Sequence, residues 1–362
     1  MMRTKVIIIC LAVGMLMGMH LAAQTETAPL VFKDRFQPVT EDNIFKTDDY
    51  FNWCSSVLKG EDGKYHLFYS RWPKKFTFSG WLTHSEIAHA IADHPAGPWE
   101  YKETVLQGRG KGYWDAITAH NPKIEKFGDT YYLYYISTNM GSRRYTEAEL
   151  IETARAGSSH PNWKEQLRPN QRTGVAVSGS INGPWTRLDQ PLIEPSGPIT
   201  TLTVNPAIAQ GKDGQYYLIV KGDKPNQTAF VRNQAVALSK SPTGPFEMQP
   251  KAVIDDRDTE DMSIWYDDTR KRFYGIFHAH TFIGMIQSSD GIHWMEASSF
   301  EIMKKQIPFA DGSNLIPDRM ERPFLFLEGD TPKVLSLAVK KGDEAYIVFV
   351  PLEEHTGQQV SQ

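Results

Sequence analysis

Short apolar and aromatic runs, separated by glycine and proline turns, recur along the whole chain. Their content of Tyr, Phe, Ile and Val predicts strands rather than helices. One module repeats: an x-Pro-x-Ile strand, a glycine turn, an aromatic strand, a small-residue strand and a Gly-Pro-aromatic turn. HNPKIEKFGDTYYLYY at 120–135 matches VNPAIAQGKDGQYYLIV at 204–220. AIADHPAGPW at 90–99 matches AVSGSINGPW at 176–185 and ALSKSPTGPF at 237–246.

Five copies of this module can be traced. The first opens at 53–70, the fourth occupies 258–294 and the fifth opens at 321–339. A spacing of roughly 60 to 85 residues, with three or four short strands in each copy, predicts an all-β fold, a five-bladed β-propeller. We place it at residues 45–352. A helical insert is expected in blade two at Thr146–Gly157, because Thr146 can cap a helix that starts with acidic residues.

The two ends of the chain are predicted to lie outside the propeller. Arg3 and Lys5 precede an apolar run from Val6 to Ala23, which predicts a signal peptide over 1–23. Glycines and a histidine within the run disfavour a membrane anchor, and no lipobox ends it. We therefore expect a periplasmic or secreted protein, with an N-terminal extension at 24–44 and a C-terminal tail at 353–362.

Composition excludes several classes of partner. The net charge of −4 over 362 residues gives no basic field for nucleic acid, and no membrane insertion of the mature chain is expected. Cys54 is the one cysteine beyond the signal peptide, so an internal disulfide is excluded and no Cys/His metal spacing exists. We predict no cofactor and no metal. A helical insert of this kind can contact another subunit, so the sequence leaves open whether the protein forms a homo-oligomer.

Propeller geometry brings distant residues together, because the first strand of every blade lines the central channel. Aligning the copies places these pairs at the axis: Trp53-Cys54, His120-Asn121, Val204-Asn205, Glu260-Asp261 and Glu321-Arg322. Side chains alternate along a regular strand, so one of Glu260 and Asp261 is expected to enter the channel while the other packs or caps. Carboxylates at such a mouth would have perturbed pKa values.

The motifs HNPKI, TEDMSIWYDD and ERPFLF, with the blade SRWPKKF…GWLTHSEIAHAIADHPAGPW, resemble the five-bladed propeller glycoside hydrolases. The nearest subgroup is similar to the family-43-like and family-117-like proteins of Bacteroidetes, and the resemblance covers roughly residues 40 to 350. It implies hydrolysis of terminal sugars of an oligosaccharide. It also implies three acidic groups at the channel: a base, a helper and a general acid.

The resemblance is incomplete at the catalytic positions. Where the family places an Asp base in blade one, this chain reads NWCSSV. Asp115, just before the inner strand of blade two, is the best replacement as base. Asp261 or Glu260 would be the acid or helper, and Glu321 the third carboxylate. Glycoside cleavage needs one carboxyl that donates a proton and another, ionised, that activates water or attacks carbon. The resemblance favours inversion.

Further polar and aromatic residues are predicted to bind the sugar. His84 and Glu86, in a stretch expected to be strand, would share a face, as would His278 and His280. The full set is Arg71, Trp72, His84, Glu86, Trp114, His120, Asn121, Asn205, His278, His280 and Arg322. Several of the candidate residues have a structural alternative: the tryptophans can pack between blades, Glu321 and Arg322 can form a structural ion pair, and Asp115 can cap a turn.

Two other functions stay open from the sequence. A glycoside phosphorylase on the same fold would need basic groups at the channel to hold phosphate, for which Arg322, Lys221 and His120 are available. A non-catalytic sugar-binding propeller is suggested by the missing acid in blade one.

Overall fold

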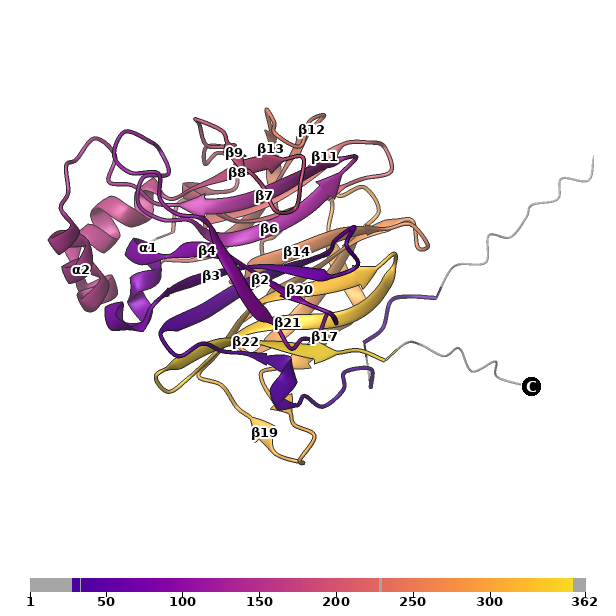
Figure 1. Ribbon diagram of the computed structural model, residues 1–362. Helices are drawn as coiled ribbons and strands as arrows, with labels where there is room; N and C mark the ends of the chain where they lie inside the picture. The colour runs from indigo at the N-terminus through magenta and orange to yellow at the C-terminus, as the bar shows by residue number, and fades with distance from the viewer. Residues whose placement is uncertain (1–27, 33, 228–229, 354–362) are drawn as a thin grey trace, which may run out of the picture.

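The computed structural model describes residues 28–32, 34–227 and 230–353. The predicted signal peptide and nearly all of the predicted C-terminal tail lie outside these residues. Five four-stranded antiparallel sheets are arranged radially, so the predicted five-bladed β-propeller is confirmed (Figure 1). No helix among the described residues is long and apolar enough to cross a membrane.

Blades one to four each run from an inner to an outer strand in sequence order. Blade one holds β2 (Tyr50–Lys59), β3 (Tyr65–Pro73), β4 (Glu86–Ala92) and β5 (Glu100–Leu106). Blade two holds β6 (His120–Phe127), β7 (Thr130–Ser137), β8 (Arg172–Ser178) and β9 (Thr186–Arg187). Blade three holds β10 (Thr200–Gln210), β11 (Tyr216–Asp223), β12 (Arg232–Ser239) and β13 (Glu247–Ile254). Blade four holds β14 (Glu260–Asp267), β15 (Arg272–His278), β16 (Phe282–Ser288) and β17 (Met295–Lys304).

Blade five is assembled from both ends of the chain. It holds β20 (Arg319–Glu328), β21 (Thr331–Lys341) and β22 (Glu344–Pro351), and its outer strand is β1 (Ile44–Phe45). Ile44 pairs with Val348 and Phe45 with Ile347. The short hairpin of β18 (Ile307–Pro308) and β19 (Asn314–Leu315) precedes this blade. The N-terminal strand therefore closes the ring non-covalently.

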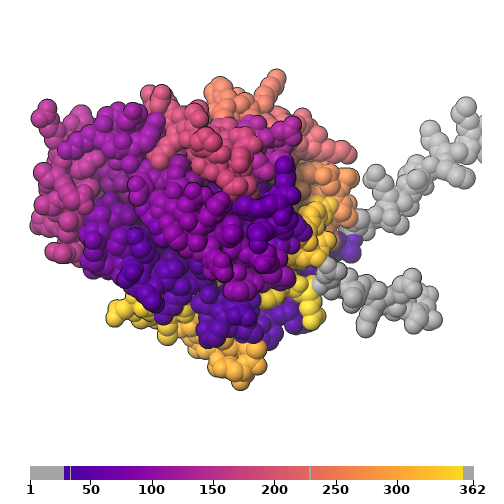
Figure 2. Space-filling view, viewed as in Figure 1, coloured from indigo at the N-terminus to yellow at the C-terminus, as the bar shows by residue number. Residues whose placement is uncertain are grey.

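Helices α1 (Trp81–His84) and α2 (Glu147–Ala156) lie side by side at one end of the propeller (Figure 1). Helix α2 begins at Thr146, whose hydroxyl accepts a hydrogen bond from the amide of Glu149, so the predicted insert in blade two is confirmed. The other elements are η1 (Glu41–Asn43), η2 (Lys74–Phe76), η3 (Phe78–Gly80), η4 (Gly157–Ser159), the π-helical η5 (Trp163–Leu167) and η6 (Arg168–Asn170). Figure 2 shows the surface from the same side, where blades one and two face the viewer.

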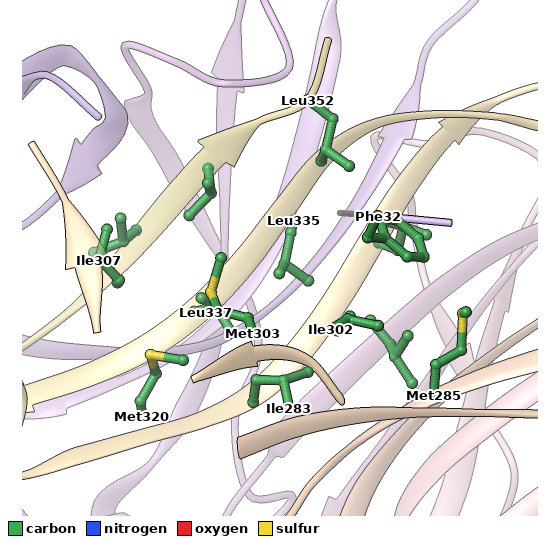
Figure 3. Packing of buried hydrophobic residues seen from close by; sticks show 14 of the residues in the cluster. Phe32, Ile283, Met285, Ile302, Met303, Ile307, Met320, Leu335, Leu337 and Leu352 are labelled. Atoms are coloured by element: carbon green, nitrogen blue, oxygen red, sulfur yellow. The ribbon is translucent and has the colours of Figure 1, made fainter. Parts of the chain in front are cut away.

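Apolar side chains between neighbouring blades form the core. Figure 3 shows the contact of blades four and five, where Ile283 and Met285 of β16 face Leu335 and Leu337 of β21. All four side chains are fully buried. Each blade thus buries both faces against its neighbours. This packing fixes the position of each inner strand along the propeller axis.

Candidate active site

Each inner strand has a β-bulge at its second axial residue. The register shifts fall between Trp53 and Ser56 in blade one and at the equivalent place in the other four blades. The bulged residues all have positive φ: Cys54 (53°), Asn121 (52°), Asn205 (55°), Asp261 (65°) and Arg322 (56°). Left-handed backbone is unfavourable for most non-glycine residues. Its recurrence in five blades indicates that the axial contacts hold it in place.

The five bulged side chains meet at the axis and form a hydrogen-bonded chain. The Cys54 thiol donates to the side-chain oxygen of Asn121, and Asn121 Nδ2 donates to Asn205 Oδ1. Asn205 Nδ2 lies 2.8 Å from Asp261 Oδ1, which also accepts from Arg322 Nη1. We call these five residues the axial ring. They line a cavity of about 20 Å³, so the ring closes the channel to a sugar chain.

Three further polar side chains lie beside Asp261. Glu260, Glu321 and His278 each have one ligand-type atom within 4.8 Å of the others and of Asp261. His278 is there because it lies directly opposite Glu260 in the pairing of β14 with β15. The predicted alternation of Glu260 and Asp261 was wrong for this pair, since the left-handed residue interrupts the strand and both carboxylates reach one cluster. We call Glu260, Asp261, His278 and Glu321 the axial cluster.

Cations surround Glu260. Its Oε1 lies 3.1 Å from Arg232 Nε, and its Oε2 lies 3.5 Å from Lys221 Nζ. Burial acts to raise the pKa of Glu260, but the charges of Lys221, Arg232 and Arg322 outweigh it and lower that pKa well below the usual range. Glu260 is therefore ionised at neutral pH, as a nucleophile or base must be.

Glu321 is buried like Glu260, but its ion-pair partner is partly exposed. Both of its oxygens accept hydrogen bonds from Arg319, at 2.7 and 3.0 Å, and the Arg319 side chain is 45 % exposed. Lys305 is half-buried nearby, and burial lowers its pKa against the opposing effect of Glu321 and Asp261. Arg319 and Lys305 are thus cations beside the cluster that a substrate can approach.

His120 occupies the axial position of blade two. It is buried against Trp72 and Trp81, and its Nδ1 lies 2.7 Å from the Ser85 hydroxyl. Burial, with a further contribution from the charge of Arg322, lowers the pKa of His120 well below its normal value. The imidazole is therefore neutral at neutral pH.

The axial cluster has the donor types of a metal site, with three carboxylates and one imidazole close together. Ion pairs already neutralise the carboxylates, because Arg322, Arg319, Lys221 and Arg232 each contact one of them. The expectation that the protein needs no metal and no cofactor stays a prediction.

The structure gives Asp115 different partners. This carboxylate is fully buried in blade two, where one oxygen lies 2.5 Å from Arg109 Nε. The other oxygen accepts from the Tyr135 hydroxyl at 2.7 Å and from Arg187 at 3.1 Å. No hydrogen bond or ion pair between described residues joins Asp115 to the axial cluster. Its oxygens are occupied by protein groups and have no exposed surface, which fits a structural ion pair better than a catalytic base.

Of the four predicted sugar contacts in and beside blade one, Arg71, Trp72 and Glu86 lie on its strands, and His84 lies on α1. Trp72 is fully buried and offers no face to a sugar. Arg71 Nε lies 2.7 Å from Glu86, and its guanidinium stacks between Tyr50 and Tyr101. His84 belongs to α1 and Glu86 begins β4, so the expected strand was wrong at His84 and the two side chains do not alternate.

The remaining predicted contacts divide between the axis and the surface. Asn121, Asn205 and Arg322 belong to the axial ring, and His278 to the axial cluster. The His280 side chain is 68 % exposed and lies 3.1 Å from Asp258. Trp114 stacks on Tyr135 and lines a surface cleft of blade two.

Sequence reasoning missed Arg232, Arg319 and Lys305, and considered Lys221 only as a phosphate ligand. The strand pairing contains a usable signal for Lys221. It lies opposite Val204 as His278 lies opposite Glu260, so the second strand of each blade adds one residue at the height of the ring. Arg319 and Lys305 lie on or beside the connection between blades four and five, where no repeat pattern places them.

No family model and no curated protein sequence matches the chain. Solved structures do match it. Zg3597, a family 117 glycoside hydrolase of the marine bacterium Zobellia galactanivorans, is similar with a TM-score of 0.60 and 15 % identity, over 91 % of this chain and 92 % of that one. CoXyl43, a family 43 β-xylosidase/α-arabinofuranosidase from a compost microbial metagenome, gives a TM-score of 0.55 and 14 % identity, over 92 % and 97 %. The endo-arabinase of Bacteroides thetaiotaomicron gives 0.55 and 12 %, over 88 % and 100 %.

These likenesses establish the class of fold. The chain has the five-bladed propeller architecture of the family 43 and family 117 glycoside hydrolases, as the sequence motifs predicted. At 12 to 15 % identity the similarity concerns the fold alone. The activity has to be argued from the axial cluster.

Proposed function

We propose that the protein is a periplasmic or secreted, exo-acting glycoside hydrolase whose reaction centre is the axial cluster. The observation that carries this proposal is the cluster itself. Glu260, Glu321 and His278 lie together beside the axial ring, at the end of the propeller where the inner strands β14 and β20 begin, on a fold shared with glycoside hydrolases. A sugar that reaches this end meets both an ionised carboxylate and further groups able to exchange a proton, as glycoside cleavage requires.

The closed ring supports action on a chain end. The cavity at the ring has a volume of about 20 Å³, room for about one water molecule and not for a sugar. A glycan therefore enters from one face only and ends at the ring. This geometry favours release of a terminal sugar.

In this proposal Glu260 is the ionised carboxylate, because Lys221, Arg232 and Arg322 keep its pKa low. Glu321 is the second carboxyl. Its partner Arg319 has a side chain that is 45 % exposed, so this arginine can move away from Glu321 and contact solvent or substrate instead. Asp261 anchors the ring, and its Oδ2 lies 3.4 Å from His278 Nδ1, which forms no hydrogen bond with a described residue.

The spacing of the two carboxylates bears on the stereochemical course. The nearest oxygens of Glu260 and Glu321 lie within 4.8 Å. Inverting enzymes need about 6.5–9.5 Å between the two carboxyl groups to admit a water, whereas retaining enzymes have about 5 Å. We therefore propose retention for this pair, in place of the inversion that the resemblance implies.

A non-catalytic sugar-binding propeller is the second candidate, and Cys54 favours it because the thiol occupies the ring position of blade one. One screen separates the two functions. The mature protein is incubated with a panel of aryl glycosides and defined oligosaccharides, with and without phosphate. Release of a monosaccharide by the wild type and not by Glu260→Gln supports a hydrolase. Binding without release in either protein would leave the non-catalytic function, and release only with phosphate would identify a phosphorylase.

A further inference from the structure

A second concave site lies on blade two, apart from the axial cluster. It is a cleft of about 730 Å³ between the connection from β5 to β6 and the connection from β7 to β8. Its side chains of interest are Lys111, Tyr113, Trp114, Arg143, Arg144 and Tyr145. We call it the blade-two cleft.

The cleft is positively charged. Three cations line it, and none of its lining residues is acidic. Arg143 is paired with Glu149 at 2.7 Å. Arg144 is exposed and makes no hydrogen bond or ion pair with any described residue. Lys111 contacts the ring of Tyr145, with its ammonium 5.2 Å from the ring centroid, and has no carboxylate partner in the part of the chain that the structure describes. Two cations are thus left for a ligand.

The walls of the cleft are aromatic. Tyr113 is 48 % exposed, and Arg109 lies over its ring at 4.3 Å. Trp114 is half-buried, held by a hydrogen bond from its indole nitrogen to the carbonyl of Leu188. Aromatic rings combine an apolar face with a polar tip, which suits the apolar face and hydroxyl rim of a sugar. A free inorganic anion would use the cations and gain nothing from these rings.

The cleft and the axial cluster open on the same end of the propeller. The connection that carries Tyr113 leads directly into His120, the first residue of β6 at the axis. The connection that carries Arg144 leaves β7 at the end where β6 begins, since the two strands are antiparallel. One glycan can therefore approach both places from one side.

We propose that the blade-two cleft binds an anionic sugar residue, one that carries a carboxylate or a sulfate group. The proposal rests on the proposed function only in taking a glycan as the ligand. Lys111 and Arg144 would hold the anionic group, and Tyr113 and Trp114 the sugar ring. Charged hydrogen bonds of this kind contribute enough for roughly a tenfold change in affinity each.

The test uses calorimetry on the mature protein with three tetrasaccharides that differ in charge: galactose, galacturonate and sulfated galactose. Inorganic phosphate is the fourth probe. We expect one or both anionic tetramers to bind at least about tenfold more tightly than the neutral one, and their affinity to fall with added salt. The two anionic arms distinguish a carboxylate from a sulfate ligand. Equal affinity for all three tetramers, or no binding of either anionic one, would overturn the proposal.

Variants assign the binding to this cleft. Lys111→Gln with Arg144→Gln should weaken the anionic tetramer by at least about tenfold, because both cations are removed. The matched control is Lys212→Gln with Lys240→Gln, which removes two exposed lysines elsewhere. Tyr113→Ala should weaken the tetramer but not phosphate. Equal affinities in the double variant and its control would refute the cleft as the binding site. An unchanged tetramer affinity in Tyr113→Ala would refute a sugar as its ligand.

This test is independent of the axial reaction. Glu260→Gln should bind the anionic tetramer as the wild type does. If no glycan is ever hydrolysed but the tetramer binds at the cleft, the proposed function fails and the cleft stands. If hydrolysis occurs but the cleft variants bind the tetramer as the wild type does, the cleft proposal fails and the proposed function stands.

Discussion

Asp261→Asn tests whether the axial ring holds the five blades together. Asp261 is the one carboxylate of the ring, buried and in contact with Arg322, Asn205 and His278. The substitution keeps the size of the side chain and removes its charge. Arg322 would then stay buried without its nearest anion, and the left-handed backbone at Asp261 would lose part of what holds it.

The magnitude follows from the burial of this pair. Removing one partner of a buried ion pair costs about 3–5 kcal/mol, because the other charge stays desolvated. Glu260 and Glu321 also attract Arg322, which reduces the penalty. We therefore expect a loss of about 3 kcal/mol in the free energy of unfolding, toward the lower end of that range.

Urea unfolding followed by tryptophan fluorescence measures this loss. The matched control is Asp268→Asn, whose carboxylate belongs to the same blade but is 75 % exposed. It should change the free energy of unfolding by less than about 0.5 kcal/mol. Combining Asp261→Asn with Arg322→Met should cost less than the sum of the single changes. A loss below about 1 kcal/mol in Asp261→Asn, or strict additivity in the double variant, would refute the ring as a stabilising element.

Three further predictions concern blades one and two and the reaction course. Asp115→Asn leaves Arg187 without its carboxylate partner and Arg109 with only the exposed Asp189, so the melting temperature should fall while turnover of the folded protein stays within a few-fold. A large loss of turnover with an unchanged melting temperature would instead indicate a catalytic base. Burial, with neighbouring cationic groups, lowers the pKa of His89 to about 3. In the unfolded state its pKa is near 6.5. Between pH 6.5 and about pH 3 the unfolded state therefore binds one more proton than the folded state, and the stability falls as the pH falls. From pH 7 to pH 5 the wild type should therefore lose about 2 kcal/mol more than His89→Gln; equal losses in urea titrations would contradict a buried neutral imidazole. Proton NMR of the first-formed sugar should show retention, and inversion would exclude Glu260 and Glu321 as the catalytic pair.

The fold could be predicted because the repeat is strong. The x-Pro-x-Ile strands recur at 120–135 and 204–220, and the weaker copies could be aligned to them. The alignment alone placed Asn121, Asn205 and Arg322 at one axial height, where the structure has them. What the repeat could not supply is the closure by β1, since two residues at the N-terminal side have no repeat pattern.

The candidate site was predicted less completely, for local reasons. A regular strand would place Glu260 and Asp261 on opposite faces, whereas the bulge in β14 brings both to one cluster. None of the five bulged residues is a glycine, so the sequence carries no signal for the bulges. Asp115 was chosen from the sequence as a replacement for the acid that the family places in blade one. Its partner Arg187 is 72 residues away, and only the fold brings the two together. Burial of Trp72 likewise depends on three-dimensional neighbours.

The most direct test of the axial cluster as the reaction centre is the turnover of Glu260→Gln and Glu321→Gln on the substrate found by screening. The control is Glu247→Gln, an exposed carboxylate on β13. We predict a loss of at least ~100-fold in kcat/KM for each axial variant, the scale of general acid–base catalysis, with folding intact and the control unchanged. Wild-type turnover in both axial variants would contradict the account.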